Sequence, residues 1–302
     1  FVDIETPYLT KSSPEGARDY LVPSRVHQSS FFALPQSPQI LKQILMTSGF
    51  DRYYQIVRCF RDEDLRADRQ PEFTQIDMEM SFVNEDDVIE IIEELIIKIF
   101  KEIKGISLSS GFKRISYQES MDRFGNDRPD LRFGLELQTI TDIFKNTDFK
   151  VFKGVIESEG VIKCIKVKDT TMTRKNIDEL TFFAQEQGAK GLAWIKVLDS
   201  ELQSPILKFF SEEEISSLKS QLKLKVGDII FFGAGDEEVV NNYMSAVRSK
   251  LGKDLGLIKS DSYEFVWITD FPLFLKIDNK VTSTHHPFTM PKHESIDEKN
   301  LT

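Results

Sequence analysis

Side chains of two kinds alternate strictly along one segment near the start of the chain. Residues 74–82 divide into two sets that point to opposite sides: Thr74, Ile76, Met78, Met80 and Phe82 on one, and Gln75, Asp77, Glu79 and Ser81 on the other. A period of two is typical of a β-strand, so the pattern predicts a half-buried strand whose polar face carries carboxylates and an amide. Residues 53–60 are rich in β-branched and aromatic side chains, and they are the predicted antiparallel partner.

The ten residues 61–70 between these strands are strongly charged. They hold three Arg, three Asp and one Glu, without the Gly-Asn chemistry of a tight hairpin. A charged loop of this kind is by itself most often a solvated tip. Guanidinium groups at the loop root bind phosphate as forked donors, and the flat ring of Phe73 suits a purine. Together with the acidic and amide face of the strand, this predicts a site for a nucleotide and a small amine-bearing molecule.

A short strand at 31–34 and a helix follow the first twenty residues, which read as a strand entering a loop. Ser37 is the predicted N-cap, Pro38 takes the first helical position, and the helix is expected to end near Gly49. Lys42 falls on the polar side of the first turns, with Gln36, Ser37 and Gln39 close by. Such a cluster suits recognition of a carboxylate and an amine, although a helical Lys is usually a solvent-facing charge.

In the second part of the chain, the sequence pattern predicts a series of helices and strands. After an amphipathic helix at 86–104, stopped by Gly105, the pattern predicts a strand and short helix within 106–125. Further elements are predicted as helices at 137–144, 174–187 and 237–251, strands at 151–156, 161–167, 192–197 and 228–232, and a capping box at 211–214. Glu238 occupies the third glycine position after Gly233 and Gly235, which argues against a dinucleotide loop. An apolar strand at 264–274 is expected to return to the first domain's sheet.

Bulk composition indicates a globular protein of about two domains' size. The 302 residues are 40% hydrophobic and 29% charged, and the net charge of −10 argues against broad nucleic-acid coating but not against one local RNA contact. Two cysteines indicate a reducing cytoplasm and, without a Cys/His cluster, no zinc site. Charges interrupt the most apolar helical stretch, so no membrane span is expected. The start at Phe1, without an initiator Met, suggests a piece of a longer protein.

Two runs in the charged hairpin resemble a known family. Phe60-Arg-Asp-Glu-Asp64 and Gln70-Pro-Glu-Phe-Thr-Gln-Ile-Asp77 resemble motif 2 of the class II aminoacyl-tRNA synthetases, in the wording of the bacterial-type aspartyl-tRNA synthetases. Residues 1–20 resemble the end of motif 1 and its flipping loop, and Thr284-His285-His286 resembles the family's histidine pair. The resemblance implies an α+β fold, in which an antiparallel-sheet catalytic domain (1–125 and 263–302) is interrupted by an inserted α+β domain (126–262).

The resemblance also implies roles for single residues. Arg61 would be the catalytic residue that holds the ATP α-phosphate and the aspartate carboxylate, and Lys42 would pair with the substrate's side-chain carboxylate. The ATP site would comprise Arg61, Asp62, Glu63, Gln70 and Phe73, with the ring of Phe73 stacked on adenine. The aspartate site would comprise Glu15, Ser37, Gln39, Lys42, Arg61, Gln75, Asp77, His285 and His286. No metal ligand is assigned within these 302 residues.

The activity implied is that of an aspartate–tRNA ligase with ATP and Mg²⁺. It would convert L-aspartate to aspartyl-adenylate and pass it to the 3′ end of tRNA(Asp), with tRNA(Asn) left undecided, as a cytoplasmic homodimer. The family's anticodon-binding barrel, its Mg²⁺-binding acid and motif 3 are not found in the sequence, so the chain alone is expected to be inactive. Two alternatives stay open: an asparagine-handling class II enzyme, and a non-catalytic module that binds nucleotide or tRNA.

Overall fold

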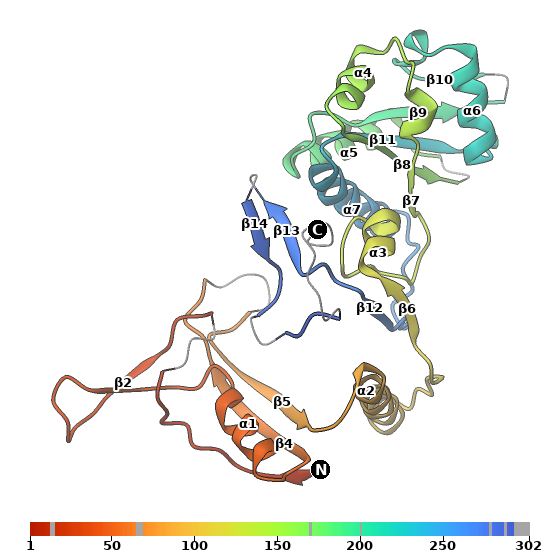
Figure 1. Cartoon of the computed structure of the whole chain (residues 1–302). Helices are drawn as coiled ribbons and strands as arrows, with labels where there is room; N and C mark the ends of the chain where they lie inside the picture. Colours follow the sequence, from red (N-terminus) through yellow and green to blue (C-terminus); the bar gives the residue numbers. More distant parts are fainter. Residues whose placement is uncertain are drawn as a thin grey trace. The chain divides into compact units, whose positions relative to one another are not determined.

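The chain divides into two compact units (Figure 1). A computed structural model describes residues 1–12, 16–64, 69–168, 171–199, 201–277, 280–286 and 289–292. The first unit comprises Phe1–Gly111 and Leu273–Thr302, and the second comprises Phe112–Pro272. In the described part of the chain, no helix combines the length and the apolar composition that crossing a membrane requires.

The first unit is built on a three-stranded sheet of order β1-β4-β5. Its strands are β1 (Val2–Asp3), β4 (Arg52–Phe60) and β5 (Glu72–Met80). β4 and β5 pair antiparallel from Arg52↔Met80 to Phe60↔Glu72, as the alternation predicts, while β1 pairs parallel with β4. Helix α1 (Gln39–Thr47) lies against both long strands (Figure 1). Two ribbons complete the sheets of this unit: β2 (Leu21–Pro23) with β3 (Phe31–Ala33), and β13 (Phe274–Ile277) with β14 (Lys280–Ser283).

The buried face of the β4–β5 pair is its polar face. Gln55 and Asp77 are only 3% and 7% exposed, whereas Ile56 and Ile76 on the other face are 67% and 58% exposed. The period of two was predicted correctly, and the structure shows that the apolar face is the exposed one within this unit. The physical reason is Lys42, which α1 brings onto the polar face, because a buried carboxylate is tolerated when a cation pairs with it.

The helices of the first unit begin and end close to the predicted positions. α1 starts one residue later than expected, since Pro38 rather than Ser37 is the N-cap and no side chain caps it. α2 (Glu85–Ile99) is opened by a capping box between Asn84 and Asp87. It continues as a π-helical turn over Phe100–Lys104 and stops at Gly105, whose φ of 67° is left-handed.

The second unit contains a five-stranded antiparallel sheet of order β10-β9-β11-β8-β7. Its strands are β7 (Leu137–Thr139), β8 (Val161–Val167), β9 (Ala193–Val197), β10 (Leu202–Gln203) and β11 (Ile229–Gly235). Alternate positions of the central strands enter two separate cores: Ile229 and Phe231 face α5 (Arg174–Glu186) and α7 (Glu237–Asp254), while Ile230 and Phe232 face α4 (Lys150–Glu157) and α6 (Glu212–Leu222). The sheet is therefore buried on both faces between helices.

Two elements of this unit differ from the sequence prediction. Residues 137–144, predicted as a helix, form edge strand β7 followed by a 3₁₀ turn over Thr141–Phe144, because residues 137–139 pair with β8. Residues 151–156, predicted as a strand, lie in helix α4. Its apolar residues recur at 151, 152, 155 and 156, a spacing that a short helix satisfies as well as a strand does. The predicted capping box is confirmed, since Ser211 and Glu214 open α6.

Gly233 has a packing role where β11 meets α7. A Cβ atom at this position would lie 2.6 Å from Cγ of Met244 and 2.8 Å from the Tyr243 hydroxyl. The same hydroxyl accepts a hydrogen bond from the backbone N–H of Ala234 at 2.8 Å. Close approach of strand and helix thus accounts for the glycine, in keeping with the absence of a dinucleotide motif.

As expected, residues 264–274 return to a strand of the segment 1–125, although that strand lies outside the sheet of β4 and β5. The strand is shorter than predicted, β12 (Val266–Thr269), and it pairs parallel with β6 (Lys113–Ser116) in a separate two-stranded sheet. Helix α3 (Tyr117–Phe124) follows β6, and both strands belong to the second unit. The hairpin β4–β5 lies in a different sheet, so the apolar pattern predicted the return but did not identify the partner strand.

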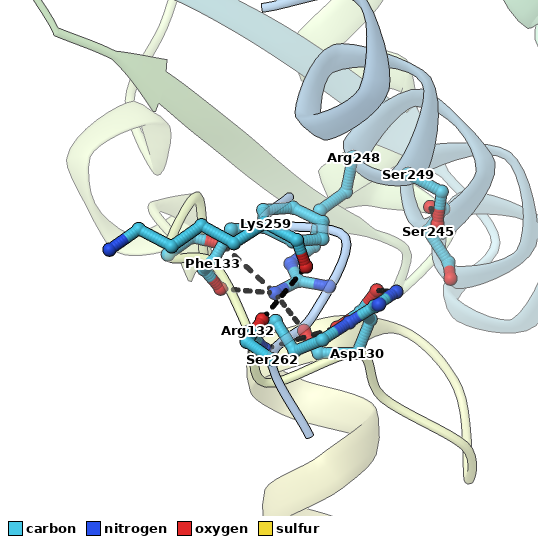
Figure 2. A network of polar contacts seen from close by, with 9 residues as sticks. Asp130, Arg132, Phe133, Ser245, Arg248, Ser249, Lys259 and Ser262 are labelled. Carbon is cyan, nitrogen blue, oxygen red and sulfur yellow. Dashed lines mark hydrogen bonds and ion pairs between the residues drawn. The ribbon is translucent and has the colours of Figure 1, made fainter. Parts of the chain in front are cut away.

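A buried arginine fastens α7 to the connection that follows α3 (Figure 2). Arg248 is 1% exposed, and its Nη2 shares its hydrogens among the backbone oxygens of Asp130, Phe133 and Gly134 at 2.8–2.9 Å. Its guanidinium carbon lies 4.2 Å from the ring centroid of Phe133 and 4.9 Å from that of Phe124. Burial lowers the pKa of Arg248 to about 10, with Asp130 and Glu136 opposing the shift, so the group stays charged at neutral pH.

Both cysteines are buried and free, and one of them gives a prediction. Burial raises the pKa of the Cys164 thiol to about 12, and the charge of Lys166 opposes this shift. At pH 8 only about one molecule in 10⁴ carries the reactive thiolate. A Cys59→Ala variant should therefore show no reaction of Cys164 with Ellman's reagent until the protein is unfolded in guanidinium chloride. Rapid reaction of the folded variant would contradict the buried position.

Candidate active site

Side chains of β4 and β5 gather on the face that α1 lies against. The register places Tyr53 opposite Glu79, Gln55 opposite Asp77, Val57 opposite Gln75 and Cys59 opposite Phe73. Directly paired residues of an antiparallel sheet share a face, so these eight side chains line one surface. Carboxylates and amides occupy one end of it, and the ring of Phe73 lies at the other.

Lys42 is the centre of the polar end. This residue is 8% exposed, and its Nζ donates to Oδ1 of Asp77 at 2.9 Å and lies 3.2 Å from Oε2 of Glu79. Two of the three ammonium hydrogens are thereby engaged, which leaves a third for a ligand. Two carboxylates around one ammonium also give the cluster a net negative charge, and this charge suits a ligand that carries an amine.

The Lys42 side chain stays protonated at neutral pH. Burial by itself lowers the pKa of this ammonium, but the hydrogen bond and charge of Asp77, followed by the charge of Glu79, outweigh it and raise the pKa above its ordinary value of 10.5. For a cation whose folded-state pKa is raised, the stabilisation is fully present below the ordinary pKa and is lost as pH rises through the higher value. The ion pair is therefore complete throughout the neutral range.

One carboxylate oxygen of Asp77 is available to a ligand. Its Oδ2 is buried, and among the described residues it has no hydrogen-bond partner. Burial and the negative charge of Asp77 raise the pKa of Tyr53, so this phenol stays protonated. The Gln55 amide lies 2.9 Å from the Tyr53 hydroxyl and 2.9 Å from Oγ1 of Thr6. An unpaired buried acceptor costs about 1–3 kcal/mol, and a ligand ammonium would relieve that cost.

A cavity of about 480 Å³ opens at the other end of the face. Its lining is Arg61, Glu63, Asp64, Arg69, Gln70, Pro71 and Phe73. The guanidinium carbon of Arg61 lies 5.1 Å from the ring centroid of Phe73, and Arg69 Nη1 lies 3.4 Å from Glu63 Oε2. A cation beside an aromatic face suits a phosphate joined to a flat base, and the volume is within the range of small-molecule pockets.

The structure brings most of the predicted residues into these two clusters. Lys42 and Asp77 meet directly, Gln75 shares their face, and four predicted nucleotide residues line the cavity: Arg61, Glu63, Gln70 and Phe73. Asp62 lies differently, because its backbone N–H donates to the backbone oxygen of Arg18 at 3.0 Å and it is not among the residues that line the cavity.

The other predicted residues lie at the edges of this region or outside it. Ser37 and Gln39 are partly buried at the start of α1, beside Lys42 in sequence. Glu15 falls outside the described residues. His285 and His286 follow β14 rather than lying in it, and His285 is partly buried whereas His286 is exposed. Their role toward an amino acid stays a prediction.

Three contacting residues were missed by the sequence reasoning. Glu79 shares its face with Asp77, and the strict alternation already contained this signal, although no role was assigned to it. Tyr53 and Gln55 lie on the partner strand, and they become part of the cluster only through the register with β5. Without knowledge of that register, the sequence does not indicate that Tyr53 and Gln55 lie beside a buried carboxylate.

The ring of Phe73 gives a testable prediction. Phe73→Ala is expected to weaken ATP binding by about 1–3 kcal/mol, the range for a base stacked on an aromatic side chain. Titration calorimetry with ATP on the full-length protein measures it, with Phe60→Ala on the opposite face of the hairpin as the control. Unchanged ATP affinity in Phe73→Ala would remove the ring from the nucleotide site.

Comparison with known proteins agrees with this geometry. The chain belongs to the family of class II tRNA synthetases (D, K and N), whose family model matches residues 1–302. It is 58% identical over 298 residues to the aspartate–tRNA(Asp/Asn) ligase of Aquifex aeolicus, with 98% of this chain and 49% of the relative covered. The aspartate–tRNA ligases of Listeria welshimeri and Staphylococcus epidermidis are 56% and 54% identical over 300 and 302 residues, with 98% of this chain and 51% of each relative covered. The chain spans about half the length of these curated relatives.

Proposed function

We propose that the protein is an aspartate–tRNA ligase, which activates L-aspartate with ATP and transfers the aspartyl group to the 3′ end of tRNA. The observation that carries this proposal is Lys42, buried between Asp77 and Glu79 on the same sheet face as the cavity beside Arg61. Phe73 and Asp77 are four residues apart on β5, about 13 Å along the strand. An aminoacyl-adenylate bridges such a span, with its base at one end and its amino acid at the other.

In the activation step, an α-carboxylate oxygen of aspartate bonds to the α-phosphorus of ATP while the bond from that phosphorus to pyrophosphate breaks. The guanidinium of Arg61 stabilises the negative charge that gathers on the α-phosphoryl oxygens. The third hydrogen of the Lys42 ammonium is donated to the side-chain carboxylate of aspartate, and Oδ2 of Asp77 accepts a hydrogen bond from the α-ammonium of aspartate. The remaining contribution is alignment, because both reactants are held on one rigid pair of strands.

The same cluster provides discrimination against asparagine. Asparagine brings a neutral amide where aspartate brings a carboxylate, so the Lys42 cation would lose an ionic partner in a site of low exposure. A site with buried polar groups rejects a ligand that leaves those groups unpaired far more strongly than a purely apolar site does. This argument favours aspartate over the asparagine-handling alternative.

Mg²⁺, the metal expected of this family, is assigned no ligand in this chain. Among the described residues there is no group of three or more His, Cys, Asp or Glu side chains placed to hold a metal ion. The carboxylate of Glu63 in the cavity is engaged with Arg69. No step of the proposal is therefore routed through a metal.

The acceptor tRNA, the cellular location and the domain organisation of the full-length protein belong to the same proposal. We propose tRNA(Asp) as the acceptor, a cytoplasmic location in line with two buried free cysteines, and a homodimeric full-length protein. Residues 126–262 are proposed as a domain inserted between catalytic segments 1–125 and 263–302. Relatives named aspartate–tRNA(Asp/Asn) ligase and aspartate–tRNA ligase are both similar in sequence, so a direct aminoacylation assay is the test for charging of tRNA(Asn).

Aspartate-dependent exchange of labelled pyrophosphate into ATP by the full-length protein tests the proposal. Exchange with aspartate and little with asparagine supports the ligase. Exchange with asparagine alone would favour the asparagine-handling alternative. Binding of ATP without exchange for either amino acid would favour the non-catalytic module.

A further inference from the structure

Cys59 lies on the same sheet face as the site, at the end that holds Phe73. It is 0% exposed on β4, directly opposite Phe73 and diagonal to Gln75 on β5. Its Sγ lies 3.1 Å from Oε1 of Gln75, and the backbone oxygen of Val57 is much farther away at 4.0 Å. Of these two oxygen atoms, that of the Gln75 side chain is thus the closer partner of the thiol.

The chemistry of the pair fixes the orientation of the Gln75 amide. A thiol has one hydrogen and donates it to a carbonyl oxygen, whereas it is a poor acceptor for an amide N–H. The oxygen of the amide is therefore held toward Cys59, and the NH₂ group is the end left for a ligand. In the described part of the chain, no hydrogen bond engages that NH₂ group. Gln75 also lies between Phe73 and Asp77 along β5, hence between the proposed nucleotide and amine positions.

We propose that Cys59 is a positioning residue of the active site, whose thiol turns the Gln75 NH₂ group toward an oxygen of the substrate. The inference rests on the proposed function. Because Gln75 lies between the positions proposed for the α-ammonium and the base, the oxygen it meets belongs to the α-carboxylate of aspartate. An amide presented as a donor suits a carboxylate oxygen and does not suit the ammonium, so Gln75 and Asp77 bind different groups of the same molecule.

Kinetics of aspartate-dependent pyrophosphate exchange by the full-length protein test this inference. Cys59→Ala removes the donor, and it is expected to raise the KM for aspartate about three- to tenfold, the loss of one neutral hydrogen bond, with little change in the KM for ATP. Cys59→Ser keeps a donor of the same direction and should recover most of the aspartate affinity. Cys164→Ala is the matched control, because Cys164 is also free and 0% exposed but lies in the core of the second unit.

The outcomes separate the possibilities. Equal KM values for aspartate in Cys59→Ala and Cys164→Ala, or a Ser variant as impaired as the Ala variant, would overturn the positioning role. If Cys59→Ala does not fold, as judged by its thermal melting, Cys59→Val serves as the donor-free variant. A wild-type protein that binds ATP but shows no exchange with aspartate would overturn the proposed function, and the inference with it.

Discussion

Lys42→Met is expected to raise the KM for aspartate by on the order of 10²–10³-fold in the full-length protein, with little change in the KM for ATP. The reason is that Lys42 is the cation that lies among the buried carboxylates at the amino-acid end of the sheet face, 2.9 Å from Asp77 and 3.2 Å from Glu79. Methionine matches the length of the lysine stem but brings no charge and no donor. The cavity lined by Arg61 and Phe73 does not include Lys42, so the nucleotide contacts are retained.

Pyrophosphate exchange at varied aspartate and varied ATP measures the two effects separately. Gln43→Met is the matched control, because Gln43 is the next residue of α1 and is exposed. The variant also leaves Asp77 and Glu79 buried without their cation, so thermal melting should accompany the kinetics. Equal losses of aspartate and ATP affinity in a folded Lys42→Met protein would show that Lys42 does not select the amino acid.

Arg248→Met is expected to destabilise the second unit by about 3 kcal/mol or more. The substitution removes the charged donor that lies 2.8–2.9 Å from three backbone oxygens of the 130–134 connection. These three oxygens then lack their hydrogen bonds to Arg248. The substitution also removes the cation that lies 4.2 Å from the Phe133 ring. The apolar stem of methionine fills part of the space, so the loss reports mainly on the hydrogen bonds.

Denaturation in guanidinium chloride followed by tryptophan fluorescence measures this effect, because both tryptophans, Trp194 and Trp267, belong to the second unit. Arg132→Met is the control, since Arg132 pairs with Asp130 at 2.7 Å in the same connection but is partly exposed. Its loss is expected to cost much less than that of Arg248, as for other solvent-accessible ion pairs. Equal destabilisation by the two variants would show that the buried hydrogen bonds of Arg248 do not stabilise the second unit more than an exposed ion pair does.

The sequence predicted the long elements, and the structure brings many of the predicted site residues together, while the failures have physical causes. Strict alternation identified β5, and the motif wording placed Arg61 and Phe73 at one cavity. The alternation did not show which face of the hairpin is buried, because a pattern of polar and apolar residues cannot show that a lysine from α1 neutralises Asp77. Short apolar runs such as 151–156 fit helix and strand equally, and only the tertiary contacts of Phe152 decide between them.

Arg248 and Cys59 illustrate what the sequence could not show. Each is an ordinary residue of its element by pattern, and each gains its role from a partner that is distant in the sequence or in another strand. Arg248 contacts backbone oxygens more than 110 residues away. Cys59 contacts Gln75 only because the register of β4 and β5 is fixed. Backbone acceptors and strand register leave no signature in residue type.

The central claim is that one face of β4–β5 holds an aspartyl-adenylate, with its side-chain carboxylate at Lys42. Titration calorimetry of the full-length protein with aspartyl-sulfamoyl adenosine, a stable analogue of the adenylate, tests it most directly when set against the asparaginyl counterpart. The account predicts that the aspartyl compound binds at least about 10²-fold more tightly, and that Lys42→Met removes most of this difference. Equal affinity of the wild-type protein for the two compounds would contradict it.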